Sequence, residues 1–413
     1  MINLYIIDNK GWRASEYGVG TYMNELSLVI DKDIINVTFI YLFSPISNKV
    51  LSIMENGVNK LHIPSPTLKE TNNKKQYECY YKSAIFILKK YINNQNNLIF
   101  HLNYFEFFPL LSSLKTYFNC KIILAIHFLS WSFSLNGNAK RFKNIIKQKI
   151  PILNNFEKKI KDSFNMDKEF LDCVDIVLCL SKNTANIIHK MYKIENRKII
   201  IIYNGLTDRN QKIVNKELLR RKLNIPLQTP VVIYVGRLDP IKGLSYLIKA
   251  SKIVLEHYPN CHFVIAGSGD YDTYMKECNN KWMNIHFTGL LEKSDLYELY
   301  SIADFGIIPS LHEQCSYVAI EMMMHGLPII ASTSTGLSEM IKENTNGLHI
   351  PVIEFDDKVD IDVELLAEKM IFMLENEMER KKMGINSRKR YEKLYSSKIM
   401  GEKMIRLYFN LFK

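Results

Sequence analysis

The chain has 413 residues, of which 47% are hydrophobic and 23% charged. This is the composition of a globular protein, and the length predicts two domains of about 200 residues each rather than one core. No stretch of 18 apolar residues occurs, which excludes a membrane-spanning helix. Seven cysteines without a C-x-x-C pair argue against a disulfide framework and favour a cytoplasmic protein. The net charge is +11, but Ile and Asn are abundant together with Lys, as an AT-rich coding bias produces. The excess lysines are therefore expected to be solvated surface residues, and no nucleic-acid partner is expected.

Short apolar runs alternate with helical patterns along the whole chain, which is typical of parallel α/β layers. In the first half, strands are expected at residues 4–7, 37–43, 98–102, 121–126, 176–180 and 199–203. In the second half, they are expected at 231–235, 262–266, 284–287, 305–308 and 328–331. Several are continuous β-branched runs, as expected for strands buried on both faces. The Asn204-Gly205 turn signal divides the chain into domains 1–205 and 206–396, and a last helix of about 397–413 can pack on either.

A basic segment lies between residues 140 and 161. It contains a single acid, Glu157, and apolar residues are interleaved with its cations. The basic residues are Lys140, Arg141, Lys143, Lys147, Lys149, Lys158, Lys159 and Lys161. Such a segment can lie on an anionic membrane surface or can be an ordinary solvated helix face, and the sequence leaves both open.

Two glutamates eight positions apart, Glu313 and Glu321, are the most informative feature of the second half. The residues around them read as a strand end, a loop, a short helix and a Gly-Pro break. A helix that opens just after Glu313 offers backbone N–H groups that favour phosphate. One carboxylate then lies in the loop and the other about one turn inside the helix. This geometry suits a nucleotide-sugar, with its phosphate on the amides and its hydroxyls on the carboxylates.

Further candidates follow other expected strands. Arg237 and Lys242 lie in a Gly-containing loop after residues 231–235, where two cations can grip a diphosphate, although loop cations are often simply solvated. Gly267 belongs to a second glycine loop, which alone is a weak signal. In the first half, Gly18 between a strand and a helix can admit a phosphate or form an ordinary turn. His127 ends a strand, as site residues of α/β folds do, but a lone histidine can equally be structural.

Taken together, these elements resemble the retaining glycosyltransferases of the GT-B fold, specifically the family 4 group, also called glycosyl transferases group 1. Five ordered motifs between residues 231 and 347 carry the resemblance. They are Gly236-Arg237-Leu238 with Lys242-Gly243, Ala266-Gly267-Ser268-Gly269, Pro309-Ser310 with Glu313 and Glu321, Gly326-Leu327-Pro328-Ile329-Ile330-Ala331, and Gly336-Leu337-Ser338-Glu339. The resemblance implies two Rossmann-like domains facing each other across a cleft, the first on the acceptor side and the second binding the donor.

The resemblance also implies residue roles. Arg237 and Lys242 would hold the donor diphosphate, Glu321 the ribose and Glu313 the transferred sugar. Gly18 would meet the phosphate and His127 the reacting sugar. Further donor contacts are expected from Gly236, Gly267, Leu290, Cys315, Ser316 and Tyr317. The chain departs from the family where Gln314-Cys315-Ser316 replaces Pro-Phe-Gly after the first glutamate, although Ser316 can still cap the helix.

The expected activity is therefore sugar transfer from a nucleoside diphosphate donor to a hydroxyl acceptor, with retention and without a metal, because two cations and helix-start amides can stabilise the leaving group. The expected setting is synthesis of polysaccharide, lipid-linked glycan or another glycoconjugate, in the cytoplasm or at the inner face of a membrane. A peptide or small-molecule acceptor, a non-catalytic nucleotide-sugar-binding protein, and epimerisation or phosphorolysis remain alternatives. The sequence does not specify the sugar, the nucleotide, the acceptor or the oligomeric state.

Overall fold

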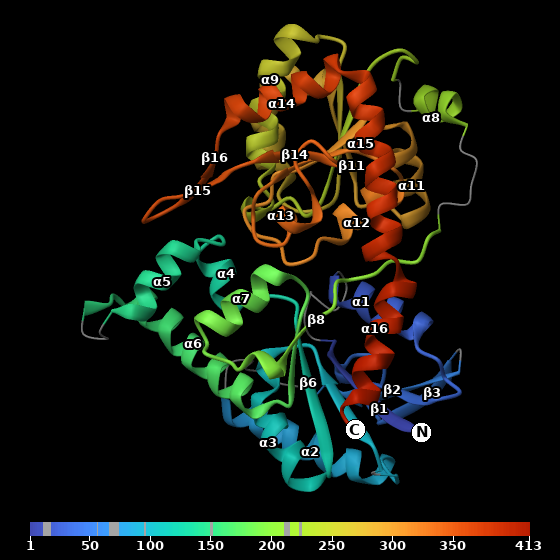
Figure 1. The fold of residues 1–413 in the computed structure, drawn as a ribbon, viewed down its shortest axis with the longest axis vertical. Coiled ribbons are helices and arrows are strands. Elements are labelled where there is room, and N and C mark those ends of the chain that lie inside the picture. The colour runs from blue at the N-terminus through green and yellow to red at the C-terminus, as the bar shows by residue number, and fades with distance from the viewer. Residues whose placement is uncertain are drawn as a thin grey trace. The chain divides into compact units, whose positions relative to one another are not determined.

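The structure is a computed structural model that describes residues 1–10, 18–55, 57–65, 74–94, 96–148, 152–209, 215–222 and 225–413. The chain forms two compact units, which are described separately (Figure 1). The first comprises Met1–Phe128, Asp162–Gly205 and Ser397–Lys413, and the second comprises Leu129–Lys161 and Leu206–Ser396. Within the described ranges, no helix combines the length and the apolar character needed to cross a bilayer.

An eight-stranded sheet in the order β3-β4-β2-β1-β5-β6-β7-β8 forms the centre of the first unit. All neighbouring strands run parallel except β3 and β4, which are antiparallel. The strands are β1 (Ile2–Asn9), β2 (Ile35–Ser44), β3 (Leu51–Glu55), β4 (Val58–Pro64), β5 (Leu98–Leu102), β6 (Cys120–Ile126), β7 (Ile176–Cys179) and β8 (Ile199–Ile201). The strand order changes direction between β1 and β5, which is where open α/β sheets bind ligands.

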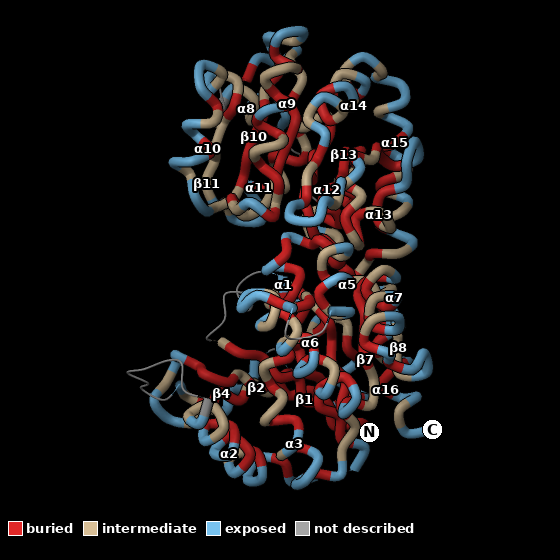
Figure 2. Tube along the Cα trace, turned by 90° about the vertical axis from the view of Figure 1, so that its left-hand side faces the viewer, coloured by how far each residue is buried: buried red, intermediate tan, exposed pale blue. Residues whose placement is uncertain are grey.

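Apolar strands buried on both faces make the core of this sheet. All eight residues of β1 and all five of β5 are buried, and Figure 2 colours β1 mainly red. The continuous apolar runs that predicted parallel strands therefore reflect cover by helices on both sides. The hairpin of β3 and β4 was not predicted, because four of the five residues of β3 are exposed and carry no apolar periodicity.

The helices of the first unit include the C-terminal one. They are α1 (Gly18–Val29), α2 (Lys74–Tyr91), α3 (Phe108–Tyr117), α6 (Asn155–Cys173, in this unit from Asp162 onward), α7 (Lys182–Lys190) and α16 (Ser397–Asn410). Helix α16 packs closely on α1, where a Cβ added at Gly401 would lie 2.7 Å from the Cβ of Val29. The hydroxyl of Tyr408 on α16 hydrogen-bonds Nδ1 of buried His101 at 3.0 Å.

The second unit contains a six-stranded parallel sheet in the order β11-β10-β9-β12-β13-β14 and a hairpin of β15 and β16. The strands are β9 (Val231–Val235), β10 (His262–Ala266), β11 (Ile285–Gly289), β12 (Phe305–Ile308), β13 (Ile329–Ser332), β14 (Gly347–Ile350), β15 (Val352–Glu354) and β16 (Val359–Ile361). The main helices are α4 (Ser130–Ser134), α5 (Ala139–Lys147), α8 (Lys216–Lys222), α9 (Leu244–His257), α10 (Tyr271–Cys278), α11 (Lys293–Ile302), α12 (Tyr317–Met324), α13 (Leu337–Met340), α14 (Val363–Glu375) and α15 (Glu377–Arg390).

Residues 129–161 require a correction, because they belong to the second unit rather than to a domain spanning 1–205. The side-chain amide of Asn138, the N-cap of α5, donates to the carbonyls of Phe355 and Lys358 at 2.7 and 3.1 Å. The carboxylate of Glu354 accepts the N–H groups of Ala139 and Lys140 at 3.1 and 2.9 Å. These partners lie more than 200 positions away in the sequence, so local patterns carry no trace of them.

Candidate functional site

The predicted residues of the second unit lie on loops at the carboxyl ends of β9, β10, β11 and β12 and in helix α12. The first two loops are joined, because the N–H of Leu238 donates to the carbonyl of Ser268 at 2.8 Å. A Cβ at Gly267 would lie 1.8 Å from the carbonyl oxygen of Gly236, and φ of Gly267 is +149°. Glycine is therefore required at residue 267 by backbone packing. Both predicted glycines lie in this junction, and no ligand is needed to explain Gly267.

A second close approach brings the β9 loop to the β12 loop. Gly243 has φ of +72°, and a Cβ there would lie 2.0 Å from the carbonyl oxygen of Pro309. The N–H of Leu311 donates to the carbonyl of Ile241 at 2.8 Å. The short 3-10 helix Pro240–Lys242 is thereby held against the residues that follow β12.

This packing brings together two of the predicted catalytic residues. The ammonium of Lys242 forms an ion pair with the carboxylate of Glu313, and the hydroxyl of Ser310 donates to Glu313 Oε1 at 3.3 Å. The side chains of Lys242 and Glu313 are only 21% and 15% exposed, so the pair is shielded from solvent more than a surface salt bridge is. Both charges remain accessible enough to meet a ligand.

The backbone of Glu313 is fixed from the other side by the loop after β13. Its N–H donates to Thr335 Oγ1 at 3.1 Å, and its carbonyl accepts the N–H of Gly336 at 2.7 Å and the hydroxyl of Thr335. A Cβ at Gly336 would lie 1.6 Å from the carbonyl oxygen of Gln314, so only glycine fits. The Gly336-Leu337-Ser338-Glu339 motif thus supports the loop that carries Glu313.

Helix α12 begins at Tyr317, directly after this loop. The predicted capping role of Ser316 is confirmed, because its hydroxyl accepts the N–H of Ala319 at 3.3 Å. Cys315 and Ser316 are buried. The start of a helix carries a partial positive charge and backbone N–H groups, so this end of α12 favours an anion next to Glu313.

Glu321 lies inside α12 and is the most buried charge of the site, with 1% of its side chain exposed. The hydroxyl of Tyr300 donates to Glu321 Oε2 at 3.0 Å, and the ammonium of Lys293 forms an ion pair with Oε1. Burial and the neighbouring carboxylate raise the pKa of Tyr300 well above its ordinary value, which keeps that hydroxyl a donor. Lys293 is 52% exposed and reaches the carboxylate from the surface.

Arg237 is held by its own loop. Its guanidinium pairs with Asp239 at 2.9 Å, and its carbonyl accepts the hydroxyl of Tyr234 at 3.1 Å. The side chain of Arg237 is 42% exposed, so the guanidinium can also contact a ligand. Leu290, another predicted donor contact, follows β11 and is 69% exposed.

His312 lies beside Glu313 in a buried environment that lowers its pKa to about 4. The indole of Trp131 contacts the His312 ring edge-on with centroids 6.1 Å apart. A Cβ at Gly137, whose φ is +78°, would lie 2.8 Å from the carbonyl oxygen of Leu311. Residues 131–137 therefore support the loop that carries Glu313, a role that sequence reasoning missed.

Two predicted residues lie in the first unit. Gly18 is the first residue of α1 rather than part of the preceding loop, and no atom of the described residues lies within 4 Å of the Cβ position it lacks. Glu16 and Tyr17 of the same predicted loop lie outside the described residues. The open space at Gly18 means that packing within the described part of the unit does not explain the glycine.

His127 follows β6 and has a defined tautomer. Asn103 Nδ2 donates to the carbonyl of Ile7 at 3.0 Å, which turns Asn103 Oδ1 toward His127 Nε2 at 2.9 Å. Burial lowers the pKa of His127 to about 3, so the ring is neutral at physiological pH. His127 Nε2 therefore carries the proton and donates, which makes Nδ1 an acceptor.

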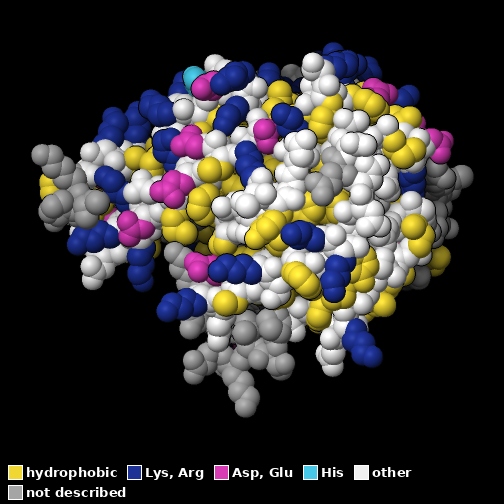
Figure 3. Space-filling model, turned by 90° about the horizontal axis from the view of Figure 1, so that it is seen from below, with side chains coloured by type: hydrophobic (Ala, Val, Ile, Leu, Met, Phe, Trp, Pro, Cys, Tyr) yellow, Lys and Arg dark blue, Asp and Glu magenta, His cyan; other side chains and the backbone are white. Residues whose placement is uncertain are grey.

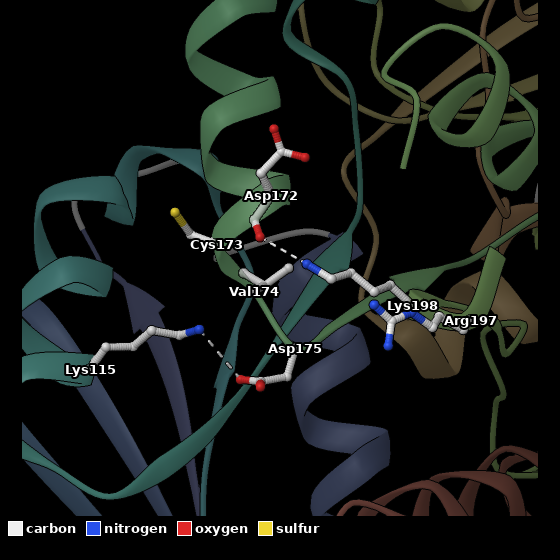
Figure 4. Close-up of a pocket in the computed structure, with 7 residues that line it drawn as sticks. All are labelled: Lys115, Asp172, Cys173, Val174, Asp175, Arg197 and Lys198. Carbon is white, nitrogen blue, oxygen red and sulfur yellow. Dashed lines mark hydrogen bonds and ion pairs between the residues drawn. The ribbon is translucent and has the colours of Figure 1, made fainter. Parts of the chain in front are cut away.

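A pocket of about 310 Å³ in the first unit lies elsewhere, at the amino ends of β7 and β8 (Figure 4). Lys198 reaches the backbone carbonyl of Asp172 at 2.8 Å, while the Asp172 carboxylate is turned away. Asp175 pairs with Lys115 at 3.8 Å and accepts the N–H of Ile122 at 2.8 Å. These contacts stabilise the end of α6 and the start of β6. The pocket is not the candidate site, because sites of α/β folds form at the carboxyl ends of the strands.

Sequence reasoning also missed the partners of the predicted residues. Lys293 and Tyr300 hold Glu321, Thr335 holds Glu313 and Asp239 holds Arg237. Only Asp239 had a local signal, because it lies two positions from its partner. The other contacts join separate loops and helices and follow from the fold alone.

Comparison with known proteins matches this site region to a family. Residues 215–390 match the family model described as glycosyl transferases group 1. These residues are a glycosyl transferases group 1 domain. They include the predicted loops after β9, β10 and β12 and the whole of α12.

Curated relatives carry glycosyltransferase names. An uncharacterized glycosyltransferase of Methanocaldococcus jannaschii is 33% identical over 181 residues, which are 42% of this chain and 46% of the relative. A GDP-mannose-dependent monoacylated alpha-(1-6)-phosphatidylinositol monomannoside mannosyltransferase of Corynebacterium glutamicum is 32% identical over 198 residues, 46% of this chain and 50% of the relative. The matches thus span about half the length of these curated relatives.

Solved structures extend the likeness to the whole fold. Sucrose-phosphate synthase from Thermosynechococcus elongatus matches with a TM-score of 0.75 at 19% identity, covering 100% of this chain and 99% of the other. Anabaena HepE in complex with UDP and glucose matches with a TM-score of 0.71 at 15% identity, covering 98% and 99%. The chain therefore has the GT-B fold, and the residues that match glycosyl transferases group 1 lie within its second unit.

Proposed function

We propose that the protein is a retaining, metal-independent glycosyltransferase that transfers a sugar from a nucleoside diphosphate sugar to an acceptor hydroxyl. One observation carries the proposal: Lys242 forms an ion pair with Glu313, which lies on the loop that leads into the start of α12. A cation, a carboxylate and a helix start are thus gathered in a glycosyl transferases group 1 domain. Solved chains of the same fold contain UDP, which supports a nucleotide-sugar as the donor.

The proposed reaction requires a site that stabilises the leaving group. When the bond between the anomeric carbon and the diphosphate breaks, negative charge collects on the terminal phosphate. Arg237, Lys242 and the first N–H groups of α12 can meet that charge with donors fixed before the reaction, which is the most effective form of electrostatic catalysis. These groups can supply the positive charge that a divalent ion provides in other enzymes, so we propose that none is needed.

Glu313 takes a binding role in this proposal. Its carboxylate accepts hydroxyl hydrogens of the transferred sugar while Lys242 moves from a shared contact with Glu313 toward the phosphate. The departing phosphate oxygen accepts the proton of the acceptor hydroxyl, so that attack occurs on the face that the leaving group vacates and the anomeric configuration is retained. Glu321 accepts the ribose hydroxyls, because each carboxylate oxygen can accept a further hydrogen bond beside the one from Tyr300 or Lys293.

Two residues of the first unit have proposed roles of their own. Gly18 admits the donor phosphate to the start of α1, and His127 Nδ1 accepts a hydroxyl hydrogen of the reacting sugar. We propose a cytoplasmic role in the synthesis of polysaccharide, lipid-linked glycan or a similar glycoconjugate. The name of the mannosyltransferase relative, which includes a phosphatidylinositol monomannoside, supports a lipid-linked glycan. The donor nucleotide, the sugar and the acceptor are left to experiment.

Three measurements test the proposal. A thermal-shift screen with UDP-, GDP- and ADP-sugars should give one nucleotide class that raises the melting temperature. Release of nucleoside diphosphate should persist in excess EDTA, and loss of release that manganese restores would refute metal independence. Proton NMR of slow donor hydrolysis should show the free sugar first in the anomeric form of the donor, whereas the opposite anomer would refute retention.

A further inference from the structure

The outer faces of α2 and α3 in the first unit carry a cluster of cations and exposed aromatic rings. We call it the α2–α3 basic surface, which comprises Lys82, Phe86, Lys89, Lys90, Lys115 and Tyr117. Phe86 is 64% exposed and Tyr117 is 51% exposed, although buried positions are usual for such rings. Figure 3 views this end of the unit and shows Lys and Arg side chains interspersed with apolar ones.

The lysines of this surface lie over its rings. Lys89 Nζ lies 4.5 Å from the ring centroid of Tyr117, which joins α2 to α3, and Lys90 Nζ lies 4.9 Å from the centroid of Phe86. Lys82, Phe86 and Lys89 lie at positions i, i+4 and i+7, a spacing that places them on one face of the helix. These cation–π contacts keep the charges and the apolar groups in one contiguous patch.

The balance of charge on this surface is strongly positive. Helix α2 contains a single acid, Glu78. Lys115 has a distant carboxylate partner, Asp175, at 3.8 Å. Among the residues that the structure describes, Lys82, Lys89 and Lys90 have no carboxylate within ion-pair distance. An open pocket of about 420 Å³, lined by Lys115, Tyr117 and four neighbouring residues, lies at the same end of α3.

We propose that the α2–α3 basic surface docks the protein on an anionic lipid bilayer. Lysines near such a surface are attracted to lipid phosphates, and exposed aromatic rings insert at the level of the headgroups. On contact, the ammonium groups of Lys89 and Lys90 move from the aromatic rings to lipid phosphates, and the uncovered rings can insert into the bilayer. The pocket beside Lys115 and Tyr117 can hold one headgroup.

A bilayer explains this surface better than nucleic acid does. Single-stranded nucleic acid requires open aromatic faces on which bases stack, along a groove that follows the backbone. Here the cations cover both rings, and the residues lie on the outside of two helices rather than in a groove. All the cations are lysines, which act as point charges without the planar fork of arginine.

Helix α5 forms the first part of the basic segment at residues 140–161, for which the sequence left contact with a membrane open, and its side chains differ from those of the α2–α3 basic surface. The apolar face of α5 is already used, because Phe142 stacks on Trp131 with centroids 4.2 Å apart and planes 7° apart. Ile145 on the same face is buried as well. Lys143 and Lys147 are exposed without a free apolar face beside them. This helix therefore offers a matched control for the proposal.

Co-sedimentation of the full chain with vesicles tests the proposal. We expect binding to phosphatidylcholine vesicles that contain phosphatidylglycerol, no binding to pure phosphatidylcholine, and loss of binding in 1 M salt. The K82Q/K89Q/K90Q variant should lower the partition coefficient about 100-fold, since each lysine near an anionic surface contributes about fivefold. Phe86→Ser should weaken binding to the same vesicles with the lysines intact.

The control variant K143Q/K147Q removes two exposed lysines from α5. It should lower the partition coefficient far less than K82Q/K89Q, a double variant that removes two lysines from the α2–α3 basic surface. The proposal fails if wild type does not bind anionic vesicles, if the two variants lose binding equally, or if K143Q/K147Q loses more. Wild type that prefers single-stranded RNA to the vesicles would also overturn it. The inference does not depend on the proposed chemistry, because nucleoside diphosphate release and the melting temperature should be unchanged in every variant.

Discussion

Lys242 and Glu313 form an ion pair across 71 positions of the sequence. Gly243 and Gly336 make the pair possible, because each lets a backbone segment approach where a side chain would collide. In the proposed mechanism the two charges separate when the donor binds, with the ammonium meeting phosphate and the carboxylate meeting sugar. The pair therefore keeps each charge compensated in the absence of donor and positions both for use.

Removing either member of this pair should abolish most turnover while leaving the fold intact. Lys242→Ala and Glu313→Ala should each lower kcat by a factor on the order of 10²–10³, which is the usual effect of losing a group that stabilises charge in the transition state. Lys249→Ala, which removes an exposed lysine on α9, is the matched control and should have no effect. Steady-state release of nucleoside diphosphate measures all three, and unchanged turnover in either site variant would remove that residue from the mechanism.

Two glycine substitutions should behave in opposite ways. Gly336→Ala places a Cβ 1.6 Å from the carbonyl oxygen of Gln314, so the loop carrying Glu313 must move, and both stability and donor turnover should fall. The Cβ of Gly18→Ala meets no atom within 4 Å among the residues that the structure describes, and alanine at a helical position is favoured by up to about 1 kcal/mol. The Gly18→Ala variant should therefore be as stable as wild type. Its donor turnover should fall, because the added methyl group occupies the space proposed for the donor phosphate.

Thermal denaturation and donor kinetics measured on both variants distinguish these effects. An active Gly18→Ala enzyme with unchanged donor KM would show that no ligand group needs the space at Gly18. A fully stable Gly336→Ala enzyme would contradict the packing described for the Glu313 loop.

Substitutions around Glu321 should act on donor binding rather than on the chemical step. Tyr300→Phe removes the hydroxyl that donates to the buried carboxylate, and the loss should destabilise the fold by about 1–3 kcal/mol. Lys293→Met removes its ion-pair partner and should raise the donor KM several-fold with kcat nearly unchanged. Lys293→Arg should restore the donor KM. A drop in kcat at constant KM would indicate that Glu321 serves the transition state instead.

Acid should destabilise the protein through its neutral histidines. Burial lowers the pKa of His101 and His127 to about 3 and that of His312 to about 4. A histidine of the unfolded chain has a pKa of about 6.5. At pH values between the folded and the unfolded pKa, the unfolded chain binds more protons than the folded protein does, so the free energy of unfolding falls as the pH decreases. Each histidine contributes a slope of up to about 1.4 kcal/mol per pH unit.

His101→Gln tests this expectation, because it removes the titrating group whose partners are Tyr22 and Tyr408. Between pH 6.5 and 5 the variant should lose about 2 kcal/mol less unfolding free energy than wild type does. Urea denaturation at the two pH values gives the comparison. Equal losses in the two proteins would show that His101 is not the source of the pH dependence.

The sequence predicted what depends on local pattern. Buried parallel strands such as β9 and β12 have continuous apolar runs, the loops that follow them hold Arg237 and Glu313, and Ser316 caps α12 as expected. Edge elements escaped prediction because they lack such runs, as the exposed strand β3 illustrates. Contacts between distant segments, such as Lys293 with Glu321 and Asn138 with Phe355, are set by the fold and leave no local signal.

The central claim is that a nucleoside diphosphate binds the second unit at the start of α12. A crystal structure of the full chain with UDP or GDP, whichever raises the melting temperature, tests it most directly. We predict the terminal phosphate within hydrogen-bond distance of Lys242, Arg237 and the first backbone N–H groups of α12, with the ribose hydroxyls on Glu321. A nucleotide bound at any other place in the unit, or a terminal phosphate that contacts neither cation, would contradict the account.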